Sequence, residues 1–463
     1  MTGQDRYDLV VIGGGPAGEK AAAQAAYWGK RVAIVERLPH FGGTMVGGAV
    51  SSKTMREAAL YLTGFKRRDL YDVGLDLTPQ AAVTRLRART NQVERQMANT
   101  AADNMRRHGV DVIRGDAHLS SDRSVVVDDG ATATVLRADV IVLTTGSQPH
   151  HPPDVPFDDP DVLDSDAAAR LDRPSRSLVV IGGGAVGCEF ASIFMALGAE
   201  VVLIDSGPRL LPFMDGEISA LLAATFRAQG MTVVQDAGHP KVARVDGVLQ
   251  VELATGETLH PEKVVFAAGR AGNTQGLGLA DAGVDTDERG RIVVDDQFRT
   301  SAPGIYAAGD VIGPPALASV SMEQARVAVC RAFDIPLKRT VDALAPFGVY
   351  SIPEAAMVGT TEEAAIAEGI PYGVGRARFD TNTRATIAGT VEGMIKLVFH
   401  RADVRILGVH ILGDAATELI HQGQTAMHFD ATLDYFIQAT FNVPSLSESY
   451  KYAAYDGLRA VGR

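Results

Sequence analysis

Short apolar runs alternate with helical patterns at two places in the chain. The first place begins with Tyr7 to Ile12, continues through a glycine-rich turn, and has a helical pattern from Glu19 to Trp28. A second apolar run, Arg31 to Val35, ends at Glu36. Short apolar runs without alternation are typical of parallel strands covered on both faces. The pattern predicts a strand–helix–strand unit with an acid at the end of its second strand.

The turn of this unit has the spacing Gly-x-Gly-x-x-Gly, at Gly13, Gly15 and Gly18. The first glycine permits a tight turn, the second lets the backbone approach a pyrophosphate, and the third allows close packing of helix on strand. The helix N-terminus offers unpaired N–H groups to phosphates, and Glu36 can accept hydrogen bonds from ribose hydroxyls. Turn, strands and acid together predict a dinucleotide site.

The same pattern occurs again near the middle of the chain. Its parts, in order, are the strand Ser177 to Ile181, the glycines Gly182, Gly184 and Gly187, the helix Cys188 to Leu197, the strand Glu200 to Ile204, and Asp205. Two fingerprints predict two dinucleotides. A carboxylate at Asp205 pairs with the free 2′-hydroxyl of NAD and repels the 2′-phosphate of NADP. The nearest cation along the chain is Arg209, which can equally be a structural residue that binds no phosphate. The sequence therefore favours NAD(H) over NADP(H).

Other parts of the chain add elements around these units. A long helical pattern covers Thr78 to His108. From Pro346 onward, β-rich stretches with helices predict a separate α+β domain. A strand ending at Gly309 and Asp310 places a carboxylate where ligands of open α/β sheets bind. Near the C-terminus, His421 and His428 share one face of a helical pattern, and we interpret them as surface or interface residues.

Composition excludes several classes of protein. The 463 residues carry a formal net charge of −12, which argues against a nucleic-acid or anionic-membrane surface. No apolar run reaches the ~18 residues of a membrane span. The only cysteines, Cys188 and Cys330, are too few for a secreted disulfide framework, and a strand begins too early to leave room for a signal peptide. We therefore expect a cytoplasmic protein with no membrane or nucleic-acid partner and no metal.

The motifs as a set resemble the pyridine nucleotide-disulfide oxidoreductase family. They are Gly13 to Gly18 with Glu36, the Gly-Gly-Thr…Ser-Lys stretch from Gly42 to Lys53, Gly182 to Glu189, Ala268 to Arg270, and Thr300 to Asp310. The resemblance runs over essentially the whole chain. It implies an α/β fold with two Rossmann-like, glutathione reductase-like domains and a C-terminal α+β dimerisation domain, and hence a homodimer. The implied boundaries are 1–150 and 272–341 for the FAD-binding domain, 151–271 for the NAD-binding domain, and 342–463 for the interface domain.

The resemblance also implies roles for individual residues. FAD would be bound by Gly13, Gly15, Gly18, Glu36, Gly43, Thr44, Lys53, Thr145, Gly146, Gly309 and Asp310. NAD would be bound by Gly182, Gly184, Gly187, Glu189, Asp205 and Gly269. The catalytic set would be Lys53, Glu189, Met45 and Glu448, with Lys53 and Glu189 paired beside the flavin's reactive nitrogen. A cation there stabilises negative charge on the reduced ring.

The stretch from Gly42 to Lys53 departs from the family pattern because it has no cysteine. Met45 takes the place of the first redox cysteine and Ala49 roughly that of the second, in a loop one residue shorter. Dithiol chemistry is excluded on covalent grounds. Met45 is interpreted as an apolar cover of the flavin. Gly47 and Gly48 either open that face to a small acceptor or reflect loop drift.

The C-terminal acid–base motif also departs from the family. Val443 replaces its histidine, whereas Pro444 and Glu448 remain. Without an imidazole no general acid is poised for thiols. Three functions stay open: hydride transfer from NAD(P)H through flavin to a second nicotinamide nucleotide, as in the transhydrogenase branch; NADH-dependent reduction of a quinone, oxygen or another small molecule; and a silent flavin-binding scaffold. Asp205 leaves the use of NADP(H) open.

Overall fold

The computed structural model describes residues 6–43, 45–64, 70 and 78–462. The chain divides into two compact units. One comprises Met1–Ser51, Arg89–His150 and Gly269–Asp342; the other comprises Ser52–Ala88, His151–Ala268 and Ala343–Arg463. The division into four segments made from the sequence stays a prediction.

The first unit is built on one large sheet with the strand order β3-β2-β1-β6-β5-β4, and β17 also pairs with β6. Its strands are β1 (Arg6–Ile12), β2 (Val32–Glu36), β3 (Asp111–Arg114), β4 (Asp116–Leu119), β5 (Val125–Asp128), β6 (Ala133–Leu143) and β17 (Ile305–Ala307). The strands β2, β1, β6 and β17 are parallel to their neighbours in this set. Their carboxyl ends therefore meet at one edge of the sheet.

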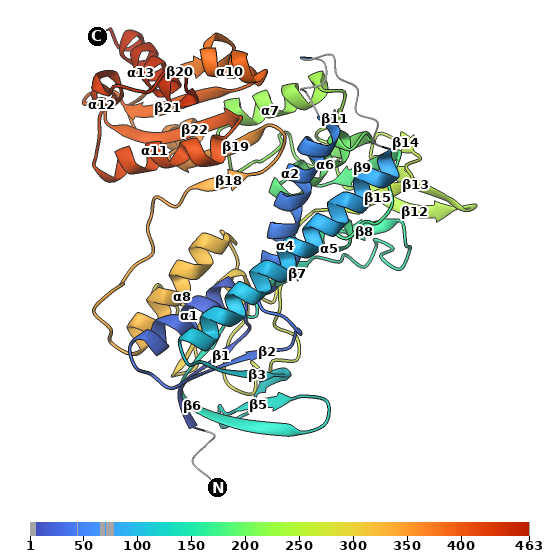
Figure 1. Cartoon of the computed structure of the whole chain (residues 1–463), viewed down its shortest axis with the longest axis vertical. Helices are drawn as coiled ribbons and strands as arrows, with labels where there is room; N and C mark the ends of the chain where they lie inside the picture. The colour runs from blue at the N-terminus through green and yellow to red at the C-terminus, as the bar shows by residue number, and fades with distance from the viewer. Residues whose placement is uncertain (1–5, 44, 65–69, 71–77, 463) are drawn as a thin grey trace. The chain divides into compact units, whose positions relative to one another are not determined.

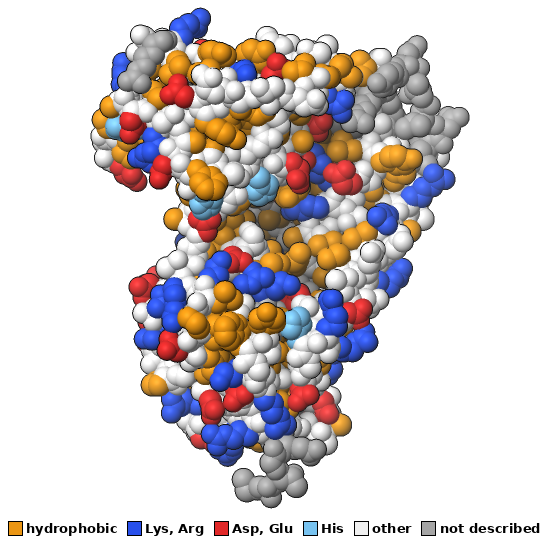
Figure 2. All heavy atoms as spheres, turned by 60° about the vertical axis from the view of Figure 1, so that its left-hand side comes forward, with side chains coloured by type: hydrophobic (Ala, Val, Ile, Leu, Met, Phe, Trp, Pro, Cys, Tyr) orange, Lys and Arg blue, Asp and Glu red, His pale blue; other side chains and the backbone are white. Residues whose placement is uncertain are grey.

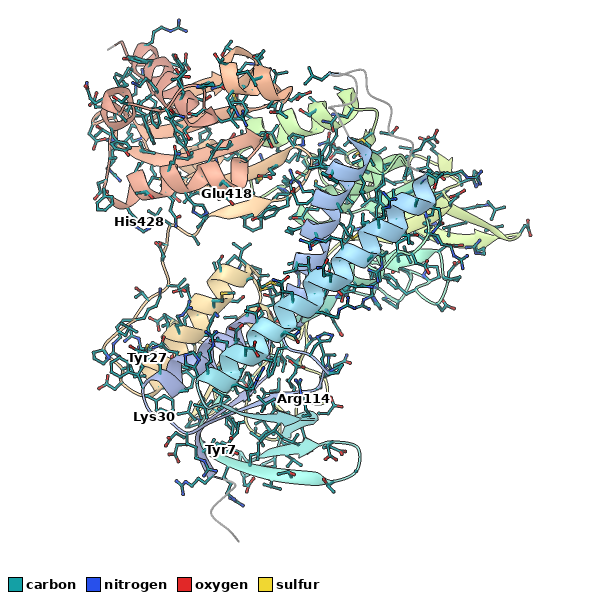
Figure 3. All side chains as sticks on the ribbon, viewed as in Figure 1. Tyr7, Tyr27, Lys30, Arg114, Glu418 and His428 are labelled. Carbon is teal, nitrogen blue, oxygen red and sulfur yellow. The ribbon has the colours of Figure 1, made fainter. Side chains whose placement is uncertain are left out.

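Two helices cover one face of this sheet and lie side by side (Figure 1). They are α1 (Pro16–Tyr27) and α8 (Ala318–Ala332). The helix α1 begins before the predicted Glu19, because Pro16 occupies its first turn, where the missing N–H of proline removes no hydrogen bond. Small side chains of α1 such as Ala21 and Ala25 are fully buried against the sheet. Lys30, just beyond α1, is labelled in Figure 3. Its ammonium lies 4.8 Å from the centroid of the Phe333 ring.

The second unit contains a five-stranded parallel sheet with the order β11-β10-β9-β15-β8. Its strands are β8 (Val162–Asp164), β9 (Ser177–Ile181), β10 (Glu200–Ile204), β11 (Thr232–Val234) and β15 (Lys263–Phe266). The helices α2 (Ser51–Thr63), α6 (Ala185–Ala196) and α7 (Gly216–Ala228) belong to the core around it, and an antiparallel sheet of β12 (Lys241–Val245), β13 (Val248–Glu252) and β14 (Thr258–Leu259) adds to it. The predicted strand–helix–strand unit is β9, α6 and β10.

The same unit contains an antiparallel sheet from the C-terminal part of the chain, in the order β18-β19-β22-β21-β20. Its strands are β18 (Phe347–Val349), β19 (Glu354–Gly359), β20 (Tyr372–Arg378), β21 (Met394–His400) and β22 (Ile406–Gly413). The helices α11 (Ala416–His428) and α13 (Ser449–Ala460) pack on it and complete an apolar core. His421 and His428 are both exposed on α11, and Figure 3 labels His428 at its end.

One buried cluster of charges ties α7 to this sheet. Lys396, in the middle of β21, has a side chain that is 1% exposed. Its ammonium pairs with Asp215 at 2.7 Å, with Glu217 at 3.0 Å, and with Glu362. These carboxylate oxygens lie within 4.8 Å of one another, close enough to hold a metal ion. The Lys396 ammonium contacts all three, and the Arg376 guanidinium also pairs with Glu217 at 2.8 Å, so side-chain cations already neutralise this cluster.

On the face drawn in Figure 2, acidic and basic side chains are interspersed. No helix in the described part of the chain is long and apolar enough to cross a membrane.

Candidate functional site

The first glycine turn has the geometry that its spacing predicts. Gly13 has φ +106°, and its N–H donates to the carbonyl of Val35 at 2.8 Å. A Cβ on Gly18 would lie 1.8 Å from the Gly13 carbonyl oxygen, so only glycine permits this approach of helix to strand. A Cβ on Gly15 would meet no atom within 4 Å. The turn therefore leaves open space at the N-terminus of α1, where unpaired N–H groups can receive a phosphate.

Glu36 anchors the same turn from the end of β2. The residue is 5% exposed. Its two carboxylate oxygens accept hydrogen bonds from the backbone N–H groups of Gly14, at 2.7 Å, and Leu38, at 2.8 Å. Each oxygen keeps a further lone pair. The carboxylate can thus hold the turn and still accept a ribose hydroxyl.

A second glycine turn lies against the first. The N–H of Gly42 donates to the Gly14 carbonyl at 2.9 Å. Gly43 has φ +48°, and a Cβ added to it would lie 3.6 Å from the Cα of Gly15. A side chain at Gly43 would lie over the turn at Gly15, whereas a Cβ on Gly42 would lie 2.1 Å from the Val46 side chain. Thr44 lies outside the described residues.

The carboxyl ends of β6 and β17 bring four more predicted FAD residues together. The side chain of Thr145 donates to the Asn273 carbonyl at 2.7 Å, and the Gly146 carbonyl accepts from the Asn273 N–H at 3.0 Å. Asp310 accepts from the Ser147 hydroxyl at 2.9 Å, directly after Gly309, which has φ +84°. Strands β6 and β17 pair in parallel, so both turns lie at one sheet edge. The open glycine turn and the carboxylates of Glu36 and Asp310 suit the phosphates and hydroxyls of FAD, and the role of each residue stays a prediction.

The glycine turn of the second unit repeats this design. Gly182 has φ +114°, and a Cβ on Gly187 would lie 1.7 Å from its carbonyl oxygen. A Cβ on Gly184 would meet no atom within 4 Å. Asp205 accepts from the N–H groups of Gly183, at 2.5 Å, and Gly207, at 2.7 Å. Gly269, with φ +124°, belongs to the other unit, where its carbonyl accepts from the N–H of His150 at 3.1 Å.

The cation nearest Asp205 along the chain is engaged elsewhere. The guanidinium of Arg209 pairs with Glu363 at 2.8 Å and donates to the Pro212 carbonyl at 2.8 Å. These contacts support the interpretation of Arg209 as a structural residue. Arg209 is therefore not directed at the Asp205 carboxylate, and the predicted preference for NAD(H) stays a prediction.

Replacing Asp205 by alanine should lower kcat/KM for NADH by about 10- to 100-fold, the effect of removing a charged hydrogen-bond partner. The value for NADPH should fall much less, because the repulsion of its 2′-phosphate disappears together with the turn anchor. Steady-state kinetics with both nucleotides measure the ratio, and the exposed neighbour Ser206→Ala is the matched control. An equal loss for the two nucleotides would show that Asp205 acts only on the turn.

Lys53 and Glu189 form an ion pair in the second unit. The Lys53 ammonium lies 2.8 and 2.7 Å from the two carboxylate oxygens of Glu189. Their side chains are 32% and 7% exposed, respectively. Glu189 also accepts from the Ser52 hydroxyl at 3.3 Å and from the N–H of Tyr350 at 3.0 Å. The helices α2 and α6 position the pair, which leaves the ammonium partly accessible.

The loop without cysteines contains a π-helix, η1 (Met45–Val50). Its wide turns are rare and occur often at functional sites. Met45 begins it, half-buried, with its N–H donating to the Gly42 carbonyl at 3.1 Å. The hydroxyl of Ser51 donates to the Val46 carbonyl at 2.8 Å and to Glu94 at 2.5 Å. These hydrogen bonds close the loop without a disulfide.

Thiol reagents should leave the protein's reaction with NADH unchanged. Cys188 and Cys330 are buried and unpaired with each other, and burial raises the pKa of the Cys188 thiol, which keeps it protonated. Excess iodoacetamide or a dithiol-specific arsenical, applied to the NADH-reduced protein, should therefore leave its turnover unchanged. Mass spectrometry of the treated protein reports alkylation. Inactivation in step with alkylation would contradict this expectation.

Glu448 and Val443, two positions of the C-terminal motif, have surroundings in the described part of the chain that do not include the Lys53–Glu189 ion pair. Glu448 accepts from the Tyr452 hydroxyl at 3.0 Å. Val443, where the family pattern has histidine, is 60% exposed. Among the described residues, no hydrogen bond or ion pair joins Glu448 to Lys53 or Glu189. Its catalytic role stays a prediction.

Several residues around the ion pair were missed from the sequence. Tyr350 contacts the pair, and Arg56 donates to the backbone beside Tyr350 and pairs with Glu354 at 3.1 Å. Tyr350 and Glu354 lie about 300 residues along the chain from α2, so no local spacing signals their contacts. Only the dipeptide Ser52–Lys53 was visible as a motif.

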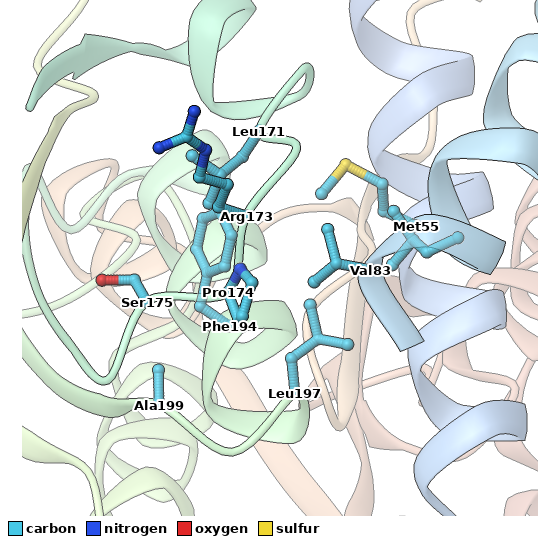
Figure 4. A pocket seen from close by; sticks show the side chains of 10 residues that line it. Met55, Val83, Leu171, Arg173, Pro174, Ser175, Phe194, Leu197 and Ala199 are labelled. Atoms are coloured by element: carbon cyan, nitrogen blue, oxygen red, sulfur yellow. The ribbon is translucent and has the colours of Figure 1, made fainter. Parts of the chain in front are cut away.

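A small apolar pocket lies in the second unit beside α2 and α6 (Figure 4). It is lined by Met55, Val83, Leu86, Leu171, Arg173, Pro174, Ser175, Phe194, Leu197 and Ala199. Neither member of the ion pair is among these residues. The pocket is therefore separate from the charged site.

Comparison with known proteins identifies the class to which this fold and these sites belong. Residues 7–329 match the family model of the pyridine nucleotide-disulphide oxidoreductases, and residues 345–454 match the model of their dimerisation domain. The chain belongs to this family, and it is an FAD-dependent pyridine nucleotide oxidoreductase. The predicted glutathione reductase-like fold with a C-terminal dimerisation domain is confirmed.

Individual relatives show which members of the family the chain is similar to. The chain is 42% identical to a soluble pyridine nucleotide transhydrogenase of Mycobacterium bovis over 465 residues, covering 98% of each chain. A protein of the same name from Hahella chejuensis is 37% identical, with 98% of this chain and 99% of the relative covered. Among solved structures, the HOCl-induced flavoprotein disulfide reductase RclA of Escherichia coli, as a Cu(II) complex, superposes with a TM-score of 0.88 at 27% identity, covering 98% of this chain and 99% of that one. LpdA of Mycobacterium tuberculosis gives 0.88 at 26% identity, covering 97% and 99%. The enzyme is transhydrogenase-like.

Proposed function

We propose that the enzyme transfers hydride from NADH through FAD to a second nicotinamide nucleotide, without a redox disulfide. The observation that carries the proposal is the intact Lys53–Glu189 pair in a chain whose Gly42 to Lys53 stretch contains no cysteine. The relatives named as transhydrogenases, which match nearly the full chain, support it.

The chain's own residues perform binding, orientation and charge stabilisation in this reaction. Bound FAD supplies a carrier that accepts hydride from one nicotinamide and returns it to another. The turns at Gly13 and Gly182 bind the pyrophosphates of FAD and of the nicotinamide nucleotide. Lys53 supplies positive charge where negative charge develops, and Glu189 holds its ammonium in place. No thiol competes for the electrons.

A second candidate is an NADH-dependent reductase of a quinone, oxygen or another small molecule. Two observations favour it. The Asp205 carboxylate and the engagement of Arg209 with Glu363 disfavour NADP as the second nucleotide. Gly47 and Gly48 also lack side chains that would cover the flavin face. Binding of hydride donor and FAD is the same in both candidates, and only the acceptor differs.

A comparison of acceptors under anaerobic conditions separates the candidates. The purified holoenzyme receives NADH together with thio-NAD, thio-NADP or a short-chain quinone, and aerobic NADH oxidation is measured separately. We expect the thionicotinamides to support turnover more than about tenfold faster than the quinone or oxygen, a difference of ~1.4 kcal/mol in barrier. Faster quinone or oxygen reduction would establish the second candidate. Transfer to thio-NAD but not thio-NADP would show that Asp205 governs both half-reactions.

A further inference from the structure

Tyr350 contacts both members of the Lys53–Glu189 pair. The Lys53 ammonium lies 4.9 Å from the centroid of the Tyr350 ring, within the range of a cation–π interaction. The backbone N–H of Tyr350 donates to a carboxylate oxygen of Glu189 at 3.0 Å. One residue thus contacts the cation through its ring and the anion through its backbone.

The backbone around Tyr350 is fixed to the two helices that carry the pair. The side chain of Arg56, on α2, donates to the Ser351 carbonyl at 3.1 Å. The N–H of Ile352 donates to the hydroxyl of Ser192, on α6, at 3.1 Å. The turn between β18 and β19 is therefore hydrogen-bonded on both sides, which gives the Tyr350 ring a defined position.

Lys53 needs such support because of the nature of its side chain. Lysine has a flexible four-carbon stem, and holding it in one rotamer costs conformational entropy. Its ammonium is partly exposed, so attraction to Glu189 alone is weakened by solvent. A ring packed against the ammonium restricts it and excludes water from one side.

We propose that Tyr350 is a positioning residue of the hydride-receiving site, whose ring holds the Lys53 ammonium in its productive orientation beside Glu189. The inference rests on the proposed function, in which Lys53 supplies the charge. The aromatic ring, and not the hydroxyl group, contacts the ammonium. Burial raises the pKa of the Tyr350 phenol, so the hydroxyl stays protonated and carries no charge toward Lys53.

Two substitutions separate the ring from the volume it fills. Tyr350→Phe keeps the aromatic face, and Tyr350→Leu keeps an apolar side chain without it. Stopped-flow reduction of the holoenzyme by NADH should proceed near the wild-type rate in Tyr350→Phe and about five- to tenfold slower in Tyr350→Leu, the size of one lost cation–π contact. Equal slowing in both variants, or slowing in neither, would overturn the proposal.

A double-mutant cycle shows whether Tyr350 acts through Lys53. In a Lys53→Met background, Tyr350→Leu should cause no further slowing, because the ammonium that the ring positions is gone. An undiminished five- to tenfold effect in that background would assign Tyr350 a role independent of Lys53 and overturn the proposal. Melting temperature and FAD content of each variant control for a folding defect.

A readout independent of turnover comes from NMR of the holoenzyme with ¹³C-dimethylated lysines. The Lys53 resonance, identified by its absence in Lys53→Arg, should carry a ring-current shift that persists in Tyr350→Phe and disappears in Tyr350→Leu. An unchanged shift in Tyr350→Leu would contradict the contact. Failure of NADH to reduce the wild-type enzyme would instead contradict the proposed function. The NMR shift would still test the contact between Tyr350 and Lys53.

Discussion

Replacement of Lys53 by methionine should slow flavin reduction by NADH about 10²- to 10³-fold, the usual effect of removing one preorganised group that stabilises developing charge. Its ammonium lies 2.7 Å from Glu189, whose side chain is only 7% exposed. The substitution removes the cation and leaves a nearly buried carboxylate uncompensated. Both changes disfavour the negative charge that develops on the flavin ring as it accepts hydride. Anaerobic stopped-flow absorbance of the bound flavin measures the rate.

The variants Glu189→Gln and Lys53→Met/Glu189→Gln separate charge stabilisation from simple disruption. Removing both charges relieves the unpaired carboxylate, so the melting temperature of the double variant should recover toward that of wild type. Its rate should remain low, because the cation is still missing. Recovery of the rate together with the melting temperature would show that Lys53 acts only on the fold.

The second large effect concerns stability and lies at Lys396. Replacing this residue by methionine should destabilise the protein by about 3–5 kcal/mol, the typical result of removing one partner of a buried ion pair. The ammonium contacts Asp215, Glu217 and Glu362, and Asp215 is fully buried. Arg376 would still pair with Glu217 and Glu362, but the buried Asp215 carboxylate would lose its cation. Chemical denaturation followed by fluorescence measures the loss.

A matched control is available in Lys263, whose ion pair with Asp161 is partly exposed. Lys263→Met should cost no more than about 1 kcal/mol, since exposed pairs contribute little. An equally small effect of Lys396→Met would mean that its three carboxylates find other partners. The comparison isolates burial as the cause.

The same cluster sets a pH dependence. Burial favours the protonated carboxyls of Asp215 and Glu217. Hydrogen bonds and charge from Lys396, and from Arg376 beside Glu217, outweigh burial and hold the pKa of each acid below its ordinary value. Groups with depressed folded pKa values contribute stability that is present above the unfolded value and lost as pH falls through the folded one. Stability should therefore fall below about pH 4, and less steeply in Lys396→Met, in which these pKa values are no longer held down.

The sequence predicted the parts of the sites that depend on local backbone geometry. Gly13, Gly18, Gly182 and Gly187 are required by close approaches within one strand–turn–helix unit, and their spacing records that requirement. The strand β9 has the predicted bounds. Such features involve few residues and short distances along the chain, so a pattern reveals them.

Features that depend on tertiary packing could not be predicted. Lys396 stands in an apolar run, and only the packing of α7 on β22 shows that it is buried among acids. Tyr350 reaches Lys53 from a distant part of the chain. The π-helix at Met45 has no periodicity that six residues could display. For Lys396 and Tyr350 the deciding partner lies far away along the chain, outside any local sequence pattern.

The central claim, hydride transfer through flavin between two nicotinamides without a thiol, is tested most directly by the oxidative half-reaction. The holoenzyme is reduced anaerobically with one equivalent of NADH and mixed in a stopped-flow instrument with a thionicotinamide nucleotide. We expect flavin absorbance to recover together with formation of the reduced thionicotinamide, at a rate at least equal to kcat. A flavin that NADH bleaches and that then stays reduced in the presence of the thionicotinamide would contradict the account.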